Sequence, residues 1–247
     1  MQIDDPHNIE GSLVTIKAYY SSGKEIDGTG LLIAIDDECS NDRDSDTPDL
    51  SDNDNKLTDA GKSRQYMLLT NRYICFLKDI ACNSFSIHHR NGVSHYTMNA
   101  DTIKKIKFSL HYLMCVRIGL EDGTQHACLP RSVLRDRQVR DNEQLFVSGY
   151  FKACSDQLHR CSANKISATQ AVQFSTDPVR WQHRQIRIVN DHEEQHDYYY
   201  GQQQQGQHYY AGCVIWNDSG PVGMIVGKVG SKDNLVYASI DDILSIL

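Results

Sequence analysis

Short apolar runs of strand length, separated by turn-forming residues, recur along almost the whole chain and leave little room for helices. The run 12–20 is rich in β-branched and aromatic residues and alternates with polar ones, and the run 31–35 is entirely apolar. Further runs of this kind are 65–70, 85–87, 104–108, 112–120, 144–148, 165–168, 185–189, 212–216, 223–229 and 234–237. Many short strands with frequent turn signals predict an all-β protein with a barrel or sandwich architecture.

Only the C-terminal segment 239–247 has the pattern of a helix. Ser239 is a suitable N-cap, and Asp241 and Asp242 lie where negative charge stabilises the positive end of the helix dipole. The apolar residues of this segment fall on one face of a helix. We therefore expect one short helix at the end of an otherwise all-β chain.

The net charge of −7 is concentrated in one segment of the chain. Residues 36–60 contain ten acidic side chains against Arg43 and Lys56, so this stretch carries −8 and the remaining chain about +1. Because 36–64 is rich in Asp, Ser and Asn, we expect a disordered insert that binds a basic partner or serves only as a solubilising loop. The neutral body lacks a clustered basic face, which argues against nucleic-acid binding.

No stretch of the sequence reaches the roughly 18–20 consecutive apolar residues that a membrane-spanning helix requires. The first residues, MQIDDPHNIEG, lack the basic and apolar regions of a signal peptide. We therefore expect an intracellular protein, in the cytoplasm or the nucleus, with no membrane partner and no cofactor. The eight cysteines include no C-x-x-C pair, which favours free buried thiols over a disulfide or zinc framework.

A tight turn at 217–222, with the sequence Asn-Asp-Ser-Gly-Pro-Val, is the first stretch that could carry chemistry. Ser219 lies there between Asp218 and Gly220, after one apolar run and before another. Such a turn can present a nucleophilic hydroxyl beside backbone N–H groups. The stretch resembles the trypsin-like serine proteases, which carry Gly-Asp-Ser-Gly-Gly-Pro around the nucleophile.

The resemblance extends over most of the chain in the order that the family has. The segment 28–33 resembles the family's Gly-Ser/Thr-Gly-apolar strand, and 68–74 resembles the Leu-Thr-Asn/Ala-x-His segment that supplies the general base. The segment 112–118 resembles the Asp-Leu-Ala-apolar strand that orients this base. The segment 145–150 is similar to the strand that opens the second barrel, and 237–244 to the helix that closes HtrA-like members.

This resemblance implies two six-stranded antiparallel β-barrels with a short C-terminal helix. The N-terminal barrel would span 1–120, including the disordered insert 36–64. A connector would follow over 121–142, and the C-terminal barrel with the terminal helix would span 143–247.

The residues at the matched catalytic positions depart from the family pattern. The match places Arg72 at the base position, where a guanidinium stays protonated and cannot accept a proton from a serine. It places Tyr112 at the position of the orienting acid, where there is then no carboxylate to stabilise an imidazolium. Ser219 is therefore predicted to be a vestigial nucleophile.

The turn around the serine departs as well. Asn217 replaces a glycine two residues before Ser219, and only one glycine, Gly220, follows it, which disturbs the N–H groups that would bind an oxyanion. The family's pocket base lies six residues before the serine, so the resemblance implies that Cys213 gives a small, uncharged pocket. Asn217, Gly220 and Cys213 are thus the expected binding residues.

The leading hypothesis is a catalytically inactive protease homologue that serves as an intracellular protein-binding module. A substrate cleft without chemistry still suits an extended peptide that binds by β-augmentation. The alternative is an intracellular serine endopeptidase in which Ser219 works in a rearranged site with a different base.

A third hypothesis, a zinc hydrolase, rests on the H-E-x-x-H match formed by His192, Glu193 and His196. In zinc proteases this motif lies on a half-buried helix, so that both imidazoles face the metal. Here the neighbours are polar residues, tyrosines and glutamines, with no third ligand at a suitable spacing. We therefore expect no catalytic metal, and at most a weak surface site at the two histidines.

Overall fold

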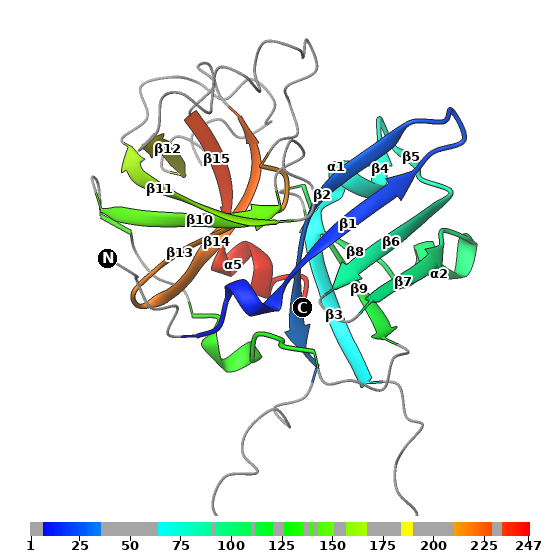
Figure 1. Ribbon diagram of the computed structural model, residues 1–247, viewed down its shortest axis with the longest axis horizontal. Coiled ribbons are helices and arrows are strands. Elements are labelled where there is room, and N and C mark those ends of the chain that lie inside the picture. The colour runs from blue at the N-terminus through cyan, green and yellow to red at the C-terminus, as the bar shows by residue number, and fades with distance from the viewer. Residues whose placement is uncertain are drawn as a thin grey trace, which may run out of the picture.

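The chain folds into two β-structured units that lie side by side, with the C-terminal helix between them (Figure 1). The computed structural model describes residues 7–35, 64–89, 92–109, 112–120, 126–135, 139–140, 143–150, 157–166, 184–189, 210–228 and 234–247. The insert predicted over 36–64 lies outside the described residues, apart from Arg64, so its disorder and its basic partner stay predictions.

The N-terminal unit is a seven-stranded sheet in the order β7-β6-β1-β2-β3-β9-β8. Its strands are β1 (Leu13–Tyr19), β2 (Glu25–Ala34), β3 (Arg64–Asn71), β6 (Ser84–His89), β7 (Gly92–Thr97), β8 (Lys107–Phe108) and β9 (Leu113–Leu120). The sheet curls, since the Tyr96 hydroxyl of β7 donates to the Gly119 carbonyl of β9 at 2.9 Å. The predicted six-stranded closed barrel is therefore only a half-barrel here, because β8 is two residues long and hydrogen-bonds to β9 alone.

The C-terminal unit is a closed six-stranded barrel, as predicted, in the order β10-β11-β12-β15-β14-β13. Its strands are β10 (Gln144–Tyr150), β11 (Leu158–Ile166), β12 (Gln185–Val189), β13 (Val214–Asn217), β14 (Gly220–Lys228) and β15 (Asn234–Ser239). All pairs are antiparallel. Together the two units confirm the predicted all-β fold, with one closed barrel and one half-barrel.

The terminal helix α5 (Ile240–Leu244) forms as predicted. Ser239 is its N-cap, and Asp242 completes a capping box with it. Two short helices were not predicted, α1 (Arg72–Cys75) and α2 (Ala100–Lys104). The predicted strand 104–108 is wrong at its start, because Asn99 caps α2 by accepting the Thr102 N–H at 2.8 Å and the helix then includes residue 104.

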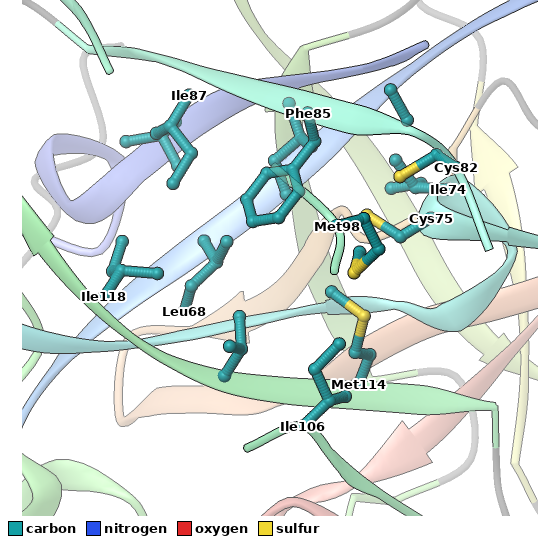
Figure 2. Packing of buried hydrophobic residues seen from close by; sticks show 14 of the residues in the cluster. Leu68, Ile74, Cys75, Cys82, Phe85, Ile87, Met98, Ile106, Met114 and Ile118 are labelled. Carbon is teal, nitrogen blue, oxygen red and sulfur yellow. The ribbon is translucent and has the colours of Figure 1, made fainter. Parts of the chain in front are cut away.

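Apolar side chains fill both units and the space between them. One cluster joins strands of both units to α5, through residues such as Ile33, Trp216 and Ile240. A second fills the N-terminal half-barrel (Figure 2), and a third fills the closed barrel. The first cluster fixes the two units against each other, because separating them would expose this apolar surface to water.

Six of the eight cysteines are described, and all six are free, as predicted. Four of them are buried, namely Cys75, Cys82, Cys115 and Cys213. None of the helices in the described part of the chain is long and apolar enough to cross a membrane. The expected intracellular location stays a prediction.

Candidate functional site

The junction of the two units is held together by buried hydrogen bonds. The Thr70 hydroxyl donates to the Thr29 carbonyl at 2.7 Å, and the Thr29 N–H donates across the junction to the Ala211 carbonyl at 3.1 Å. The Tyr150 N–H donates to the Thr29 hydroxyl at 2.8 Å. Thus β2 and β3 of the half-barrel contact the end of β10 and the segment that precedes β13.

Gly212 makes this close approach feasible. Its φ is +80°, and a Cβ built on it would lie 2.0 Å from the carbonyl oxygen of Thr29. An L-residue would therefore meet both backbone strain and a direct overlap with backbone.

Asn71 connects this junction to helix α1. Its side-chain oxygen accepts the Tyr73 N–H at 2.9 Å, which caps the helix, and its amide nitrogen donates to the Val226 carbonyl of β14 at 3.1 Å. The buried amide thus fixes the start of α1 against the C-terminal barrel. Tyr73, the second residue of the helix, is placed by the same cap.

Tyr73 and Tyr112 stack on each other at this junction. Their ring centroids are 5.3 Å apart and their planes differ by 20°. Tyr112 has a φ of +63°, and its carbonyl accepts the Arg72 N–H at 2.7 Å, which holds its backbone beside α1. Burial raises the pKa of Tyr73, and the neighbouring phenol of Tyr112 raises it further. Both rings are half-buried, so the pair presents part of its aromatic surface to solvent.

Arg72 does not face Tyr112 with its side chain, contrary to the predicted pairing of these two positions. Its guanidinium forms an ion pair with Asp79 and lies over the ring of Phe108, 5.2 Å from the centroid. The prediction misplaced the position by one residue: in the Leu-Thr-Asn-x-His pattern, counting from Thr70 makes Arg72 the variable residue and Tyr73 the match to histidine. The sequence therefore contained the signal for Tyr73.

Ser219, the predicted vestigial nucleophile, lies at the end of the C-terminal barrel away from the tyrosine pair. It is exposed in the turn that joins β13 to β14, where the Asn217 side chain accepts its N–H at 2.9 Å and donates to Glu143 at 2.6 Å. Glu143 precedes β10, whereas Tyr150 at the other end of β10 contacts the junction. At about 3.3 Å per residue, seven residues of strand separate the two ends by roughly 20 Å.

The other predicted binding residues are structural in this fold. Asn217 and Gly220 pair with each other and close the β13–β14 hairpin, where Gly220 has a φ of +122°. Cys213 lies at the junction but is fully buried inside the C-terminal barrel, 3.6 Å from the Thr29 hydroxyl. Burial raises its pKa to about 12. A thiol that is inaccessible and protonated at neutral pH neither lines an open pocket nor acts as a nucleophile.

The C-terminal unit brings the segment 210–213 to the junction, in the sequence Tyr-Ala-Gly-Cys. It contains no serine or threonine hydroxyl. The segment therefore brings no serine or threonine nucleophile to the junction. Sequence reasoning missed the segment because the Ser-Gly-Pro turn that follows it has a stronger local pattern.

Two serine–histidine hydrogen bonds occur elsewhere, on the β6–β7 hairpin. His88 Nε2 lies 3.0 Å from the Ser86 hydroxyl, and His89 Nε2 lies 3.4 Å from the Ser94 hydroxyl. Ser86 is fully buried, so it cannot reach a substrate. The Ser94 contact is at the limit of hydrogen bonding.

The zinc motif His192–His196 lies outside the described residues. Within the ranges that the structure describes, no group of three or more His, Cys, Asp or Glu side chains could hold a metal ion. The expectation of a weak surface metal site is thus untested.

Comparison with known proteins agrees with this fold. No protein-family profile matches the chain, and no curated protein matches it. Many solved structures do match. The Rv3671c protease from M. tuberculosis, in its active form, has 11% identity and a TM-score of 0.53 over 100% of this chain and 87% of its own.

Two further solved structures are similar over nearly the whole chain. The MamO protease domain from Magnetospirillum magneticum has 11% identity and a TM-score of 0.53 over 98% of each chain. Tobacco etch virus protease, solved with product, has 11% identity and a TM-score of 0.51 over 99% of this chain and 82% of its own. The chain therefore has the trypsin-like protease fold, and at this identity the comparison defines the fold alone.

Proposed function

We propose that this protein is a catalytically inactive homologue of the trypsin-like serine proteases, which binds an extended protein or peptide segment at the junction of its two units. The observation that carries the proposal is the stacked pair of Tyr73 and Tyr112. The resemblance would require a histidine base and its orienting carboxylate at these two positions.

The chemistry of the pair supports the loss of catalysis. A phenol has an ordinary pKa of about 10, so it holds its proton at neutral pH and cannot take one from a serine. Burial raises the pKa of Tyr73 further. Without a base, a serine hydroxyl is a poor nucleophile, and the segment 210–213 contains no serine or threonine.

The surroundings of the pair support binding. The Ser109 N–H donates to the Leu113 carbonyl at 3.1 Å, so the outer strand β8 ends next to Tyr112. Phe108 of β8 is exposed, and Arg72 lies over it. An extended segment can hydrogen-bond to such an outer strand through its main chain, while one of its side chains packs on the tyrosine rings.

The first test is intact-mass analysis of the folded protein after treatment with a fluorophosphonate, beside Ser219→Ala. We expect no adduct on either protein, because a serine without a base does not react with this reagent. A single adduct on the wild type that disappears in Ser219→Ala would instead establish the alternative, a serine endopeptidase with a rearranged site. An adduct that maps to another serine would equally contradict an inactive protein.

The second test is selection of binders from a displayed library of random peptides, followed by affinity measurements on the selected peptides. We expect Tyr73→Ala to weaken binding about tenfold, because a stacked aromatic contact contributes up to about 1.5 kcal/mol. Tyr96→Ala is the matched control, since Tyr96 is also half-buried and stacks on Phe85, but lies on the outer strand β7. Equal losses for both variants would contradict binding at the junction.

A further inference from the structure

Two buried thiols face each other at the base of the hairpin formed by β4 (Phe76–Leu77) and β5 (Ile80–Ala81). Cys75 ends helix α1 immediately before β4, and Cys82 follows β5. The ladder of the hairpin ends at Phe76 and Ala81, and the two cysteines flank this last pair. The Cys82 N–H donates to the Cys75 carbonyl at 2.8 Å, which brings the two residues together.

The proximity of the two residues suits a disulfide bond. They are joined by the backbone hydrogen bond and by a hydrogen bond between the two thiols, and disulfide bonds span Cα distances of about 4.4–6.8 Å. Figure 2 shows the two thiols side by side within the apolar cluster of the half-barrel.

The two thiols are also chemically unequal. They hydrogen-bond to each other, and this contact raises the pKa of Cys75, with burial adding to the rise, while it lowers the pKa of Cys82. Of the two thiols, Cys82 is therefore the one that loses its proton more readily. An attacking thiolate beside a second thiol that can resolve a mixed disulfide is the arrangement that disulfide exchange requires.

The hairpin between the two thiols is short and exposed at its tip. Strands β4 and β5 form a separate two-stranded sheet of two residues each, and Ile80 at its tip is 66% exposed. The turn residues Lys78 and Asp79 have φ values of +49° and +67°, which non-glycine residues adopt at some cost. Short, exposed and strained elements open locally at low free energy, and such opening would expose Cys82 to a reagent.

We propose that Cys75 and Cys82 form a redox-active dithiol, which closes to an intramolecular disulfide in exchange with a small-molecule disulfide such as glutathione disulfide. The Cys82 thiolate attacks one sulfur of glutathione disulfide, forms a mixed disulfide and releases one glutathione thiolate. Cys75 then loses its proton and attacks the Cys82 sulfur, which releases the second glutathione. The two cysteines are oxidised by two electrons, glutathione disulfide is reduced, and both protons end on the two released thiols.

This modification site is independent of what the tyrosine pair binds. The disulfide would join the C-terminal end of α1 covalently to the end of β5, so that the hairpin between them becomes a closed loop. Helix α1 also carries Tyr73, so the redox state of the dithiol would change how firmly that ring is held.

The test is equilibration of the folded full chain in a series of glutathione buffers, from fully reducing to fully oxidising. Each sample is then quenched with N-ethylmaleimide for intact-mass and peptide analysis. We expect two fewer alkylated thiols in oxidising buffer, one peptide pair linked through Cys75 and Cys82, and full recovery of both thiols with dithiothreitol. This measurement needs no variant, so a variant that fails to fold does not affect it.

Variants then test the assignment. Cys82→Ser should abolish the linked peptide, whereas Cys128→Ser removes a half-buried thiol outside the pair and should leave the linkage unchanged. The proposal fails if both thiols remain fully alkylated in the most oxidising buffer while the protein is folded. It fails equally if they appear only as stable mixed disulfides with glutathione, or bonded to other cysteines.

Discussion

The C-terminal barrel closes its hydrogen-bonded strands into a ring, whereas the described N-terminal sheet ends in two outer strands, β7 and β8. Closure satisfies the main chain of the C-terminal unit internally and leaves its strands without edges. The open unit exposes apolar side chains on or beside these outer strands, Val93 and Phe108 among them. It also carries the tyrosine pair and the dithiol. The closed barrel is thus the more completely hydrogen-bonded unit, and the half-barrel carries the exposed strand edges.

The substitution with the largest expected effect on the free energy of unfolding tests the contact between the two units. Gly212→Ala should lower the free energy of unfolding by about 3 kcal/mol, because a left-handed φ and an overlap with the Thr29 carbonyl act together. Gly23→Ala is the matched control, with a φ of +76° and no atom within 4 Å of the added Cβ, and should cost about 1 kcal/mol. Denaturant unfolding of both variants measures the difference. Equal losses of unfolding free energy would show that the close contact between Gly212 and the Thr29 carbonyl does not stabilise the two units against each other.

The next prediction compares the two units by native-state hydrogen exchange. We expect amides of β13 and β14 to exchange on the order of 100-fold more slowly than those of β4, β5 and the outer strand β7. The reason is that the barrel strands pair on both sides, while β4 and β5 pair only with each other. Equal protection of these amides from exchange would show that the open sheet and its hairpin are no easier to open than the closed barrel.

A buried hydrogen-bond network connects the N-terminal segment to the C-terminal barrel. Removing it should lower the free energy of unfolding, but by less than Gly212→Ala does. The Trp216 indole N–H donates to the Ser148 hydroxyl at 2.9 Å, and this hydroxyl donates to Glu10 at 2.7 Å. Ser148→Ala should cost about 2 kcal/mol of unfolding free energy, because the buried indole N–H loses its acceptor. Ser132→Ala, at an exposed serine, should change this free energy by less than about 0.5 kcal/mol. A loss for Ser148→Ala as small as that for Ser132→Ala would mean that this network does not stabilise the barrel.

The smallest expected effect is a pH dependence from Glu10. Burial alone would raise its pKa, but hydrogen bonds from Arg160 and Ser148 and the charge of Arg160 lower it overall. A carboxyl with a lowered folded-state pKa stabilises the protein above its unfolded-state pKa of about 4.5, and this stabilisation is lost as pH falls through the folded-state value.

Unfolding curves at a series of acidic pH values should therefore show a smaller loss of stability for Glu10→Gln than for the wild type. The substitution itself should cost about 1 kcal/mol at neutral pH, since a half-buried charged hydrogen bond is lost. Glu25→Gln, at an exposed position, is the control for the substitution itself and should change the free energy of unfolding at neutral pH by less than about 0.5 kcal/mol. Identical pH profiles for the wild type and Glu10→Gln would contradict a stabilising role of the Glu10 carboxylate.

Strand positions followed from the sequence where the local pattern was strong. The run 185–189 coincides with β12, the run 12–20 differs from β1 by one residue at each end, and the run 112–120 differs from β9 by one residue at its start. Strand β7 was missed, because its burial alternates only weakly on the outside of the sheet. Helices α1 and α2 were missed because each is only about one turn long, and asparagine caps and tertiary packing stabilise them more than helix propensity does.

The candidate site was harder to predict than the strands. The segment match located the tyrosine region but assigned the base position one residue early, and only the stacking of Tyr73 on Tyr112 identified the facing residue. The turn at Ser219 has the local chemistry of a glycine-flanked turn, and it does form one. Its place at the far end of β10 depends on the register of β10 with β13, which no local pattern contains.

By itself, the sequence determined the all-β fold and the capped terminal helix. These features depend on hydrophobic periodicity and capping, which act over a few neighbouring residues. Closure of the C-terminal barrel followed only from the resemblance to a known family, because it depends on pairing between strands that are distant in the sequence. The tertiary structure decided that the N-terminal sheet stays open, that Tyr73 faces Tyr112, that Ser219 lies far from both, and that Cys75 lies opposite Cys82. These relations join residues through strand register and packing between the two units, and such long-range contacts have no signature in the local sequence.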